Sequence, residues 1–372
     1  MRYFFDWAGT AKPDGSVYSI PQTAPFGNPS SKHAEGRLAA AALEDARARC
    51  ARSLGVSGET LYCTSGGTES NAIVLFSQLE KKTPSAGIIT TLAEHPSVTE
   101  NCKKLQKLGI PVHNVPLDAA GTADCNAMPE SGGLVSIMTV NNETGAVSDI
   151  PGLCERVKAP SGKRAHFHSD MVQALGKIPV GTALSCLDSA SFSAHKIGGP
   201  RGIGLLYLKK PLAALISGGG QEKGIRSGTE NVAGALAFAK VLEARTGDLE
   251  NQKAAAQERI LYLIAQLRAM PRAAIIPGCR LGCPDKFSPY ILQCSFDGIP
   301  GEVMARLLDD AGFALSTGSA CSKSHKNRPV LEAMGVDKKK SMQAIRISQG
   351  WSTTGEEIEA LIAAIKAILE KH

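Results

Sequence analysis

Two residues of this sequence stand in settings that favour nucleophilic chemistry. Lys196 lies between a β-rich run and the Gly/Pro-rich stretch 198–202, in the segment SFSAHKIGGPRG. Close to a positively charged ring its neutral amine would be favoured, so it could act as a nucleophile or a base. Cys321 follows three small residues and precedes the basic stretch 322–328. Neighbouring Lys and His lower the pKa of a thiol and favour the reactive thiolate. The ordinary alternatives are a surface lysine and a buried structural cysteine.

A turn rich in glycine and hydroxyl groups precedes a predicted helix. Residues 64–71 read TSGGTESN and follow a strand predicted at 60–64. A helix N-terminus offers unpaired N–H groups and a positive dipole end, and glycines let an anion approach the backbone. This combination can seat a phosphate. An ordinary capped turn is the alternative, and for this motif taken alone it is favoured.

Asp170 ends another predicted strand, at 164–169. A carboxylate at the C-terminal end of a parallel strand points into the crevice where α/β sheets bind ligands. There it can keep a pyridinium nitrogen protonated and so make the ring an electron sink. A helix N-cap is the alternative role for such an aspartate, and both remain open at this point.

The elements that position these residues alternate between strands and helices. Further strands are predicted at 86–91, 111–115, 133–140, 188–193 and 203–208, with helical segments between several of them, and residues 204–217 resemble a local hairpin. This alternation predicts an α/β fold with a mainly parallel sheet. After the Gly-rich stretch 218–228 the pattern changes to two long helices and then to alternating strands and helices. We therefore expect a large domain over residues 11–248. Residues 1–10 and 249–372 should form a smaller α+β domain that carries the loop of Cys321.

Length and composition are those of a soluble globular protein. The chain has 372 residues, 43% hydrophobic and 20% charged, with a net charge of +6. This excess is mild, so we expect no nucleic-acid binding. No run reaches the length of a membrane span and no signal peptide is recognised, so a cytoplasmic protein with reduced thiols is expected. The ten cysteines include no repeated CxxC pair, so no metal site is predicted.

Taken together and in order, these segments resemble the cysteine desulfurases, the sulfur-mobilising branch of the class V aminotransferase family. Each motif alone is weak, but the ordered set runs along nearly the whole chain. It comprises residues 27–31, 64–71, 94–95, 141–145, 170, 173, 193–196, 218–222, 226–231, 318–321 and 345–348. The resemblance implies the aspartate aminotransferase-like fold of PLP-dependent transferases, with pyridoxal 5′-phosphate (PLP) as the cofactor.

The resemblance also implies a role for individual residues. Lys196 would form the Schiff base, His95 would stack on the pyridine ring, and Asp170 would pair with the ring nitrogen. Gln173 and Asn142 would contact the ring oxygen. The phosphate would be bound by Gly67, Thr68, Ser193 and His195, and by Thr229 from the other subunit of a homodimer. The substrate carboxylate would be bound by Asn28 and Arg346.

The implied reaction converts L-cysteine to L-alanine. The released Lys196 would remove the α-proton, and the thiolate of Cys321 would attack the substrate sulfur and keep it as a persulfide. Sulfur would then pass to an acceptor protein, for iron–sulfur clusters, thiolated tRNA or another cofactor. Eight residues separate Cys321 from the next helix at Val330, which resembles the branch of the family with a long loop.

Three segments differ from the usual family sequence. Residues 6–11 depart from the family's Asn/Ala/Thr-rich run, and residues 13–27 carry Pro21 and Pro25, which predict a shortened first helix. The basic loop 322–328 lacks the family's common Leu-Glu-Pro. We expect these differences to affect the sulfur acceptor and not the PLP residues.

Three alternatives remain beside this interpretation. One is another reaction on the same fold, selenocysteine lyase or an aminotransferase; an aminotransferase needs no loop thiol, which disfavours it. A second is a non-catalytic scaffold in a sulfur-transfer complex, which should have lost Lys196 or Cys321. The third, a zinc or iron–sulfur protein, has little support from the cysteine spacing.

Overall fold

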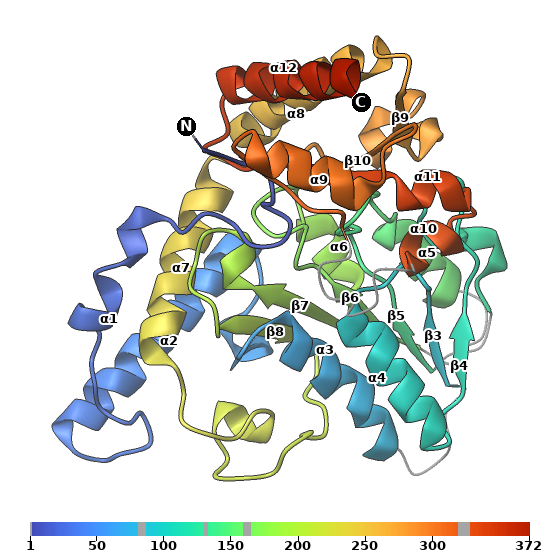
Figure 1. The fold of residues 1–372 in the computed structure, drawn as a ribbon. Helices are drawn as coiled ribbons and strands as arrows, with labels where there is room; N and C mark the ends of the chain where they lie inside the picture. Colours follow the sequence, from blue (N-terminus) through green and yellow to red (C-terminus); the bar gives the residue numbers. More distant parts are fainter. Residues whose placement is uncertain (1, 81–86, 130–132, 159–164, 319–327) are drawn as a thin grey trace.

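A mixed sheet of seven strands forms the centre of the larger part of the molecule (Figure 1). The computed structural model describes residues 2–80, 87–129, 133–158, 165–318 and 328–372. In spatial order the strands are β2 (Leu61–Thr64), β8 (Gly204–Leu208), β7 (Ser189–Ser193), β6 (His166–Asp170), β5 (Leu134–Ser136), β3 (Ile88–Thr90) and β4 (Val112–Asn114). Only β8 runs against its neighbours. The predicted, mainly parallel α/β sheet is confirmed, but β8 pairs with β7 and β2 and forms no hairpin within 204–217.

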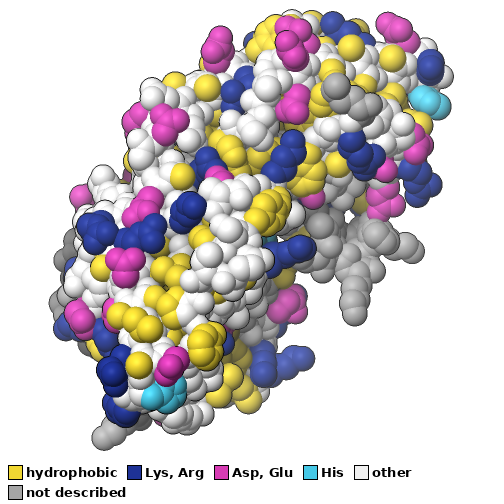
Figure 2. Space-filling view, turned by 90° about the vertical axis from the view of Figure 1, so that its left-hand side faces the viewer, with side chains coloured by type: hydrophobic (Ala, Val, Ile, Leu, Met, Phe, Trp, Pro, Cys, Tyr) yellow, Lys and Arg dark blue, Asp and Glu magenta, His cyan; other side chains and the backbone are white. Residues whose placement is uncertain are grey.

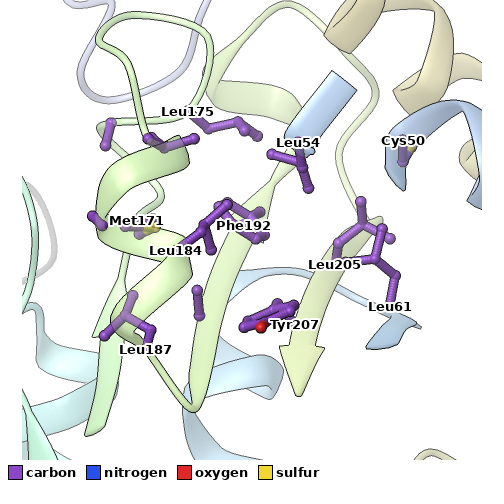
Figure 3. Close-up of a cluster of buried hydrophobic side chains, with 14 of the residues drawn as sticks. Cys50, Leu54, Leu61, Met171, Leu175, Leu184, Leu187, Phe192, Leu205 and Tyr207 are labelled. Carbon is purple, nitrogen blue, oxygen red and sulfur yellow. The ribbon is translucent and has the colours of Figure 1, made fainter. Parts of the chain in front are cut away.

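Helices cover both faces of this sheet. One face packs on α3 (Gly67–Phe76) and α4 (Pro96–Lys107), and the other on α2 (Ala34–Leu54), α5 (Ile150–Lys158), α6 (Gly181–Cys186) and α7 (Val232–Gly247). Successive strand residues point to opposite faces, so Leu205 joins one core and Leu206 the other. Figure 3 shows part of the core beneath α2 and α6, where Phe192 and Leu205 lie among Leu54, Leu184 and Tyr207.

The C-terminal third builds a second, separate hydrophobic core. A three-stranded antiparallel sheet has the order β12 (Ala344–Ser348), β10 (Ile291–Phe296), β9 (Ala273–Ile276). The helices α8 (Leu249–Arg268), α9 (Gly301–Asp310) and α12 (Gly355–Lys371) contribute to this core, whereas the short α10 (Pro329–Ala333) and α11 (Lys338–Met342) lie beside it (Figure 1). The helices α7 and α8 meet at Asp248, next to the predicted domain boundary, which itself stays a prediction.

The N-terminal segment connects the two parts. Strand β1 (Tyr3–Phe4) pairs in parallel with β11 (Phe313–Ala314), and Phe5 lies in the second core. The chain then crosses to the large sheet, where the N–H of Ala11 donates to the carbonyl of His195. Helix α1 spans only Ile20–Thr23, which agrees with the shortened helix predicted from Pro21 and Pro25. In the described part of the chain no helix is long and apolar enough to cross a membrane.

Candidate active site

Four strands deliver the predicted site residues to one edge of the large sheet. Strand β2 leads into the turn at 64–71, β3 leads toward His95, β6 ends at Asp170, and β7 leads into the short 3-10 helix Ala194–Lys196. All four strands run in the same direction, because β8 alone is antiparallel. Their carboxyl ends therefore meet at one edge, the usual ligand-binding edge of α/β sheets.

Asp170 is held by a network of buried side chains that centres on Asn71. The amide Nδ2 of Asn71 donates to Asp170 Oδ2 at 2.7 Å and to Ser97 Oγ at 2.8 Å. Its Oδ1 lies 3.0 Å from Nε2 of His168, so this nitrogen carries the proton. Asp170 Oδ1 also accepts from the N–H of Val172 at 3.0 Å. Two accepted bonds leave the carboxylate further lone pairs for a ligand.

His95 belongs to the same network and is kept neutral. Its Nδ1 lies 2.8 Å from Ser97 Oγ and accepts from the N–H of Ser97, so His95 caps the N-terminus of α4. Burial lowers the pKa of His95; Asp170 opposes this change and the positive charge of Lys196 adds to it. A neutral imidazole held by its own helix can present its flat face to an aromatic ring.

Lys196 contacts the N-terminal segment. Its Nζ donates to the carbonyl oxygens of Ala8 and Gly9, each at 2.6 Å. The same Ala8 oxygen accepts from Gln173 Nε2 at 2.9 Å, and Thr10 Oγ1 lies 3.1 Å from Nδ1 of His195. Residues 6–11 therefore contact three of the predicted cofactor residues: backbone carbonyls accept from Lys196 and Gln173, and the Thr10 side chain contacts His195. That the altered sequence of this segment spares the PLP residues stays a prediction.

The N-terminus of α3 has the features of an anion seat. No side chain of the described residues caps it, and Gly66 precedes it with φ 152°, a conformation that favours glycine. A Cβ at Gly66 would lie 3.7 Å from Ser193 Oγ, which places that hydroxyl beside the turn. A Cβ on Gly67 would come within 2.6 Å of Val172, so the turn packs directly on the loop after β6.

His195 is partly buried and neutral, whereas Thr68 and Thr229 are exposed. Burial and the nearby charges of Lys196, Lys177 and Arg201 lower the pKa of His195 to about 4, so it is a neutral hydrogen-bonding group. Thr68 is exposed on the first turn of α3, and Thr229 is exposed on the loop before α7. The segment around Thr229 is anchored to α3 because Arg226 pairs with Glu69 at 3.2 Å.

Arg346 contacts the backbone of Asn142. Its guanidinium is buried and donates to the carbonyl of Asn142 at 2.8 Å, to Asp6 at 2.7 Å and to Ser316 Oγ at 3.0 Å. Its Nε has no hydrogen-bond partner among the described residues. Asn28 is exposed, and its side chain accepts from the N–H of Ser30 in its own turn.

Cys321 lies outside the described residues, but both ends of its segment are described. Arg328 is buried and donates to the carbonyl of Thr317, so residues 317 and 328 lie close together. Arg328 also lies 3.8 Å from Glu143, whose pKa is raised by burial. The described residues that flank this segment, Thr317 and Arg328, therefore lie near Glu143, which follows Asn142 in the chain.

Sequence reasoning missed several members of this network. Asn71 was predicted only as part of the phosphate turn, and Ser97, His168, Lys177 and the carbonyl of Ala8 were not singled out. Polar side chains beside a motif residue, such as Ser97 after His95, were the available signal. Their roles depend on partners that lie far apart in the chain.

The residues at the carboxyl edge fit PLP. An uncapped helix N-terminus suits a phosphate, and a buried carboxylate with free lone pairs suits a protonated ring nitrogen. A neutral imidazole lies beside that carboxylate, and a half-buried lysine amine reaches the same edge. In the described part of the chain, no group of three or more His, Cys, Asp and Glu side chains could hold a metal.

Comparison with known proteins identifies the family of this chain. The family model described as aminotransferase class-V matches residues 2–361. A NifS/IcsS protein homolog of Lactobacillus delbrueckii subsp. bulgaricus is 39% identical over 99% of this chain and 97% of its own length. A cysteine desulfurase of Sinorhizobium fredii is 36% identical over 93% of this chain and 90% of its own length. A solved NifS-like protein superposes with a TM-score of 0.91 at 35% identity, with both chains fully covered. The chain therefore belongs to the class V aminotransferase family.

Proposed function

We propose that this protein is a PLP-dependent cysteine desulfurase that uses Lys196 and Cys321. The observation that carries the proposal is the meeting of the Lys196 amine, the neutral His95 and the Asp170 carboxylate beside the uncapped N-terminus of α3. Relatives at 36% identity that bear the name cysteine desulfurase support the choice of reaction.

Each residue of the site has a role in holding the cofactor. Asp170 would pair with the ring nitrogen, His95 would stack on the ring, and Gln173 and Asn142 would reach the ring oxygen. The phosphate would bind to the turn that carries Gly67 and Thr68, to Ser193 and His195, and to Thr229 of a second subunit. When bound, PLP supplies an electron sink for the α-carbon of the amino acid joined to it.

The chain's own groups perform the transfer of protons and sulfur. Arg346 and Asn28 would bind the carboxylate of L-cysteine, and Lys196 would remove the proton from its α-carbon. The Cys321 thiolate then attacks the substrate sulfur, so that an S–S bond forms and the carbon–sulfur bond breaks. The electron pair stays with the three-carbon product, which takes up protons and leaves as L-alanine. Cys321 keeps the sulfur as a persulfide for a sulfur-acceptor protein, which we place in iron–sulfur cluster or thio-cofactor assembly in the cytoplasm.

A homodimer is the second part of the proposal. Large hydrophobic side chains remain exposed on the N-terminal segment and α2, among them Phe26 at 90%, Tyr18 at 64% and Leu38 at 62%. Figure 2 shows hydrophobic side chains gathered on the side of the molecule where α1, α2 and α7 lie in Figure 1. Exposed apolar patches of this kind mark interaction sites. A second copy bound here would also bring in a partner residue for the phosphate, in the role proposed for Thr229.

The dimer has its own test. Light scattering should give twice the mass of one chain, and Phe26→Asp should shift the protein toward the monomer. A monomeric wild-type protein would contradict this part of the proposal.

The reaction is tested by the yield of L-alanine from L-cysteine, with PLP and a thiol reductant present. The wild-type protein should release alanine and sulfide in equal amounts, and Cys321→Ala should release almost none. Cys125→Ala is the matched control, because Cys125 is an exposed free cysteine distant in sequence from every site residue. Sulfide release by Cys321→Ala at the wild-type rate would refute the role of Cys321.

A further inference from the structure

Lys177 is a buried lysine to which the proposed reaction assigns no role. It follows Gly176 in the loop after β6, and its side chain is only 7% exposed. Burial lowers the pKa of Lys177 to about 7, and repulsion by Lys196 and Arg346 contributes. A buried amine in this position costs folding free energy, and such groups concentrate at functional sites.

The amine of Lys177 contacts the site through Gln173. Its Nζ donates to Gln173 Oε1 at 2.7 Å. Gln173 is buried, and its Nε2 donates to the Ala8 carbonyl oxygen at 2.9 Å. The same oxygen accepts from Lys196 Nζ at 2.6 Å. An unbroken row of hydrogen bonds therefore joins Lys177 to Lys196.

The chemistry of these neighbours fixes which way the Gln173 amide points. A backbone carbonyl only accepts, so the Nε2 side of the amide must face Ala8, and the Nζ of Lys177 has N–H groups to donate to Oε1 in either protonation state. Both neighbours therefore require the same orientation, with Oε1 toward Lys177 and Nε2 toward Ala8. A reversed amide would lose both bonds at once and leave buried polar groups unpaired.

We propose that Lys177 is a positioning residue that keeps Gln173 a hydrogen-bond donor toward the PLP ring oxygen. This inference rests on the proposed function, because the ring oxygen belongs to the cofactor. The Gln173 amide has two N–H groups, and Ala8 takes one of them. The second is available to an anionic oxygen only while the amide keeps this orientation.

The charged and polar surroundings of Lys177 agree with such a role. Lys196 and Arg346 repel its charge, and His195 responds to it. Lys177 and Lys196 both line a small cavity of about 10 Å³, together with Tyr290, whose buried hydroxyl has no partner among the described residues. No carboxylate is among the groups that set the pKa of Lys177. Gln173 thus takes the place that an ion-pair partner has for most buried lysines.

The test is a double-mutant cycle of Lys177→Met and Gln173→Leu, read from the absorption band of bound PLP as the pH is varied. A donor to the ring oxygen stabilises its anionic form, so Lys177→Met should raise the pH midpoint of the band by about half to one unit, the size of one hydrogen bond. In the Gln173→Leu background the same substitution should cause no further change. Lys240→Met is the control, since this exposed lysine also donates to an oxygen, the carbonyl of Ser16; it should leave the midpoint unchanged.

A second measurement, of thermal stability, does not depend on the cofactor. In the PLP-free protein, the melting temperature of the double variant should be no lower than that of the less stable single variant. Equal midpoint shifts in both backgrounds, or fully additive losses of melting temperature, would overturn the positioning role. A protein that binds no PLP would instead refute the proposed function, while the melting temperatures would still decide whether Lys177 acts through Gln173.

Discussion

The side-chain amide of Asn71 donates to the carboxylate of Asp170 at 2.7 Å, although 99 residues separate the two in the chain. The bond joins α3, the helix that follows β2, to the end of β6. Asn71 also contacts Ser97, which in turn contacts His95. The Asn71 amide therefore positions both Asp170, which is proposed to pair with the ring nitrogen, and, through Ser97, His95, which is proposed to stack on the ring.

Asn71→Leu should weaken PLP binding by about 10- to 100-fold, because a hydrogen bond to a carboxylate contributes about 1.5–3 kcal/mol. Titration of PLP into the cofactor-free protein measures the dissociation constant, and circular dichroism verifies that the variant is folded. Asn251→Leu is the matched control, since Asn251 also donates to a carboxylate, that of Asp248, but on the surface at α8. Equal affinities for the wild type and Asn71→Leu would show that this bond does not position Asp170.

His168 should make the protein sensitive to mild acid. It is fully buried, and burial lowers the pKa of His168 to about 3. Between pH 6.5 and 3 the unfolded chain binds a proton that the folded chain does not, so stability is present above pH 6.5 and is lost as the pH falls. The slope from this residue is up to about 1.4 kcal/mol per pH unit.

Urea unfolding at several pH values measures this slope. His168→Gln should flatten it between pH 6.5 and 5, whereas His113→Gln, at an exposed position of β4, should not. An unchanged slope in His168→Gln would mean that other groups cause the loss of stability.

A buried ion pair anchors the loop that leads to Thr229. Glu222 is buried, and its carboxylate accepts from Arg47 at 2.8 Å and from the N–H of Cys63 at 2.7 Å. Glu222→Gln should lower the free energy of unfolding by about 3–5 kcal/mol, because the buried charge of Arg47 loses its buried counter-ion and keeps only the exposed carboxylate of Glu44. The neighbouring pair of Lys223 and Glu59 is exposed, so Lys223→Met should leave stability nearly unchanged. Similar losses in both variants, measured by denaturant unfolding, would contradict this difference.

No residue larger than glycine should fit at position 67 unless the side chain at position 172 is made smaller. The Cβ of an alanine at 67 would lie 2.6 Å from Val172 Cγ2, and such overpacking costs about 1–3 kcal/mol. Gly67→Ala should therefore lower the unfolding free energy, and Val172→Ala in the same chain should restore most of it. If the second substitution gives no recovery, the loss has a cause other than this contact.

Local sequence signals predicted the strands and the residues that follow them. Strand β6 ends at Asp170 and β7 leads to Lys196, because β-rich runs are bounded by polar or glycine-rich segments that can be recognised locally. The same signals failed for residues 204–217. This stretch resembles a hairpin in sequence, but its strand β8 pairs with β7 on one side and with β2 on the other. Strand pairing depends on tertiary packing, which a single window of sequence does not contain.

The supporting residues were harder to predict for a similar reason. A buried lysine such as Lys177 has the same local sequence as a surface lysine, since its burial depends on how the N-terminal segment crosses the sheet. The carbonyl oxygens of Ala8 and Gly9 carry no side-chain signal at all. The resemblance to the cysteine desulfurases supplied roles for the motif residues, and the fold adds the groups that hold them.

The most direct test of the proposed reaction is the mass of the peptide that contains Cys321 after the PLP-loaded protein has turned over L-cysteine once without reductant. The peptide should gain the mass of one sulfur atom, together with one L-alanine per active site, and the gain should disappear on addition of a thiol. Alanine formed without any gain at Cys321, or with the gain at another cysteine, would contradict the proposal that Cys321 receives the sulfur.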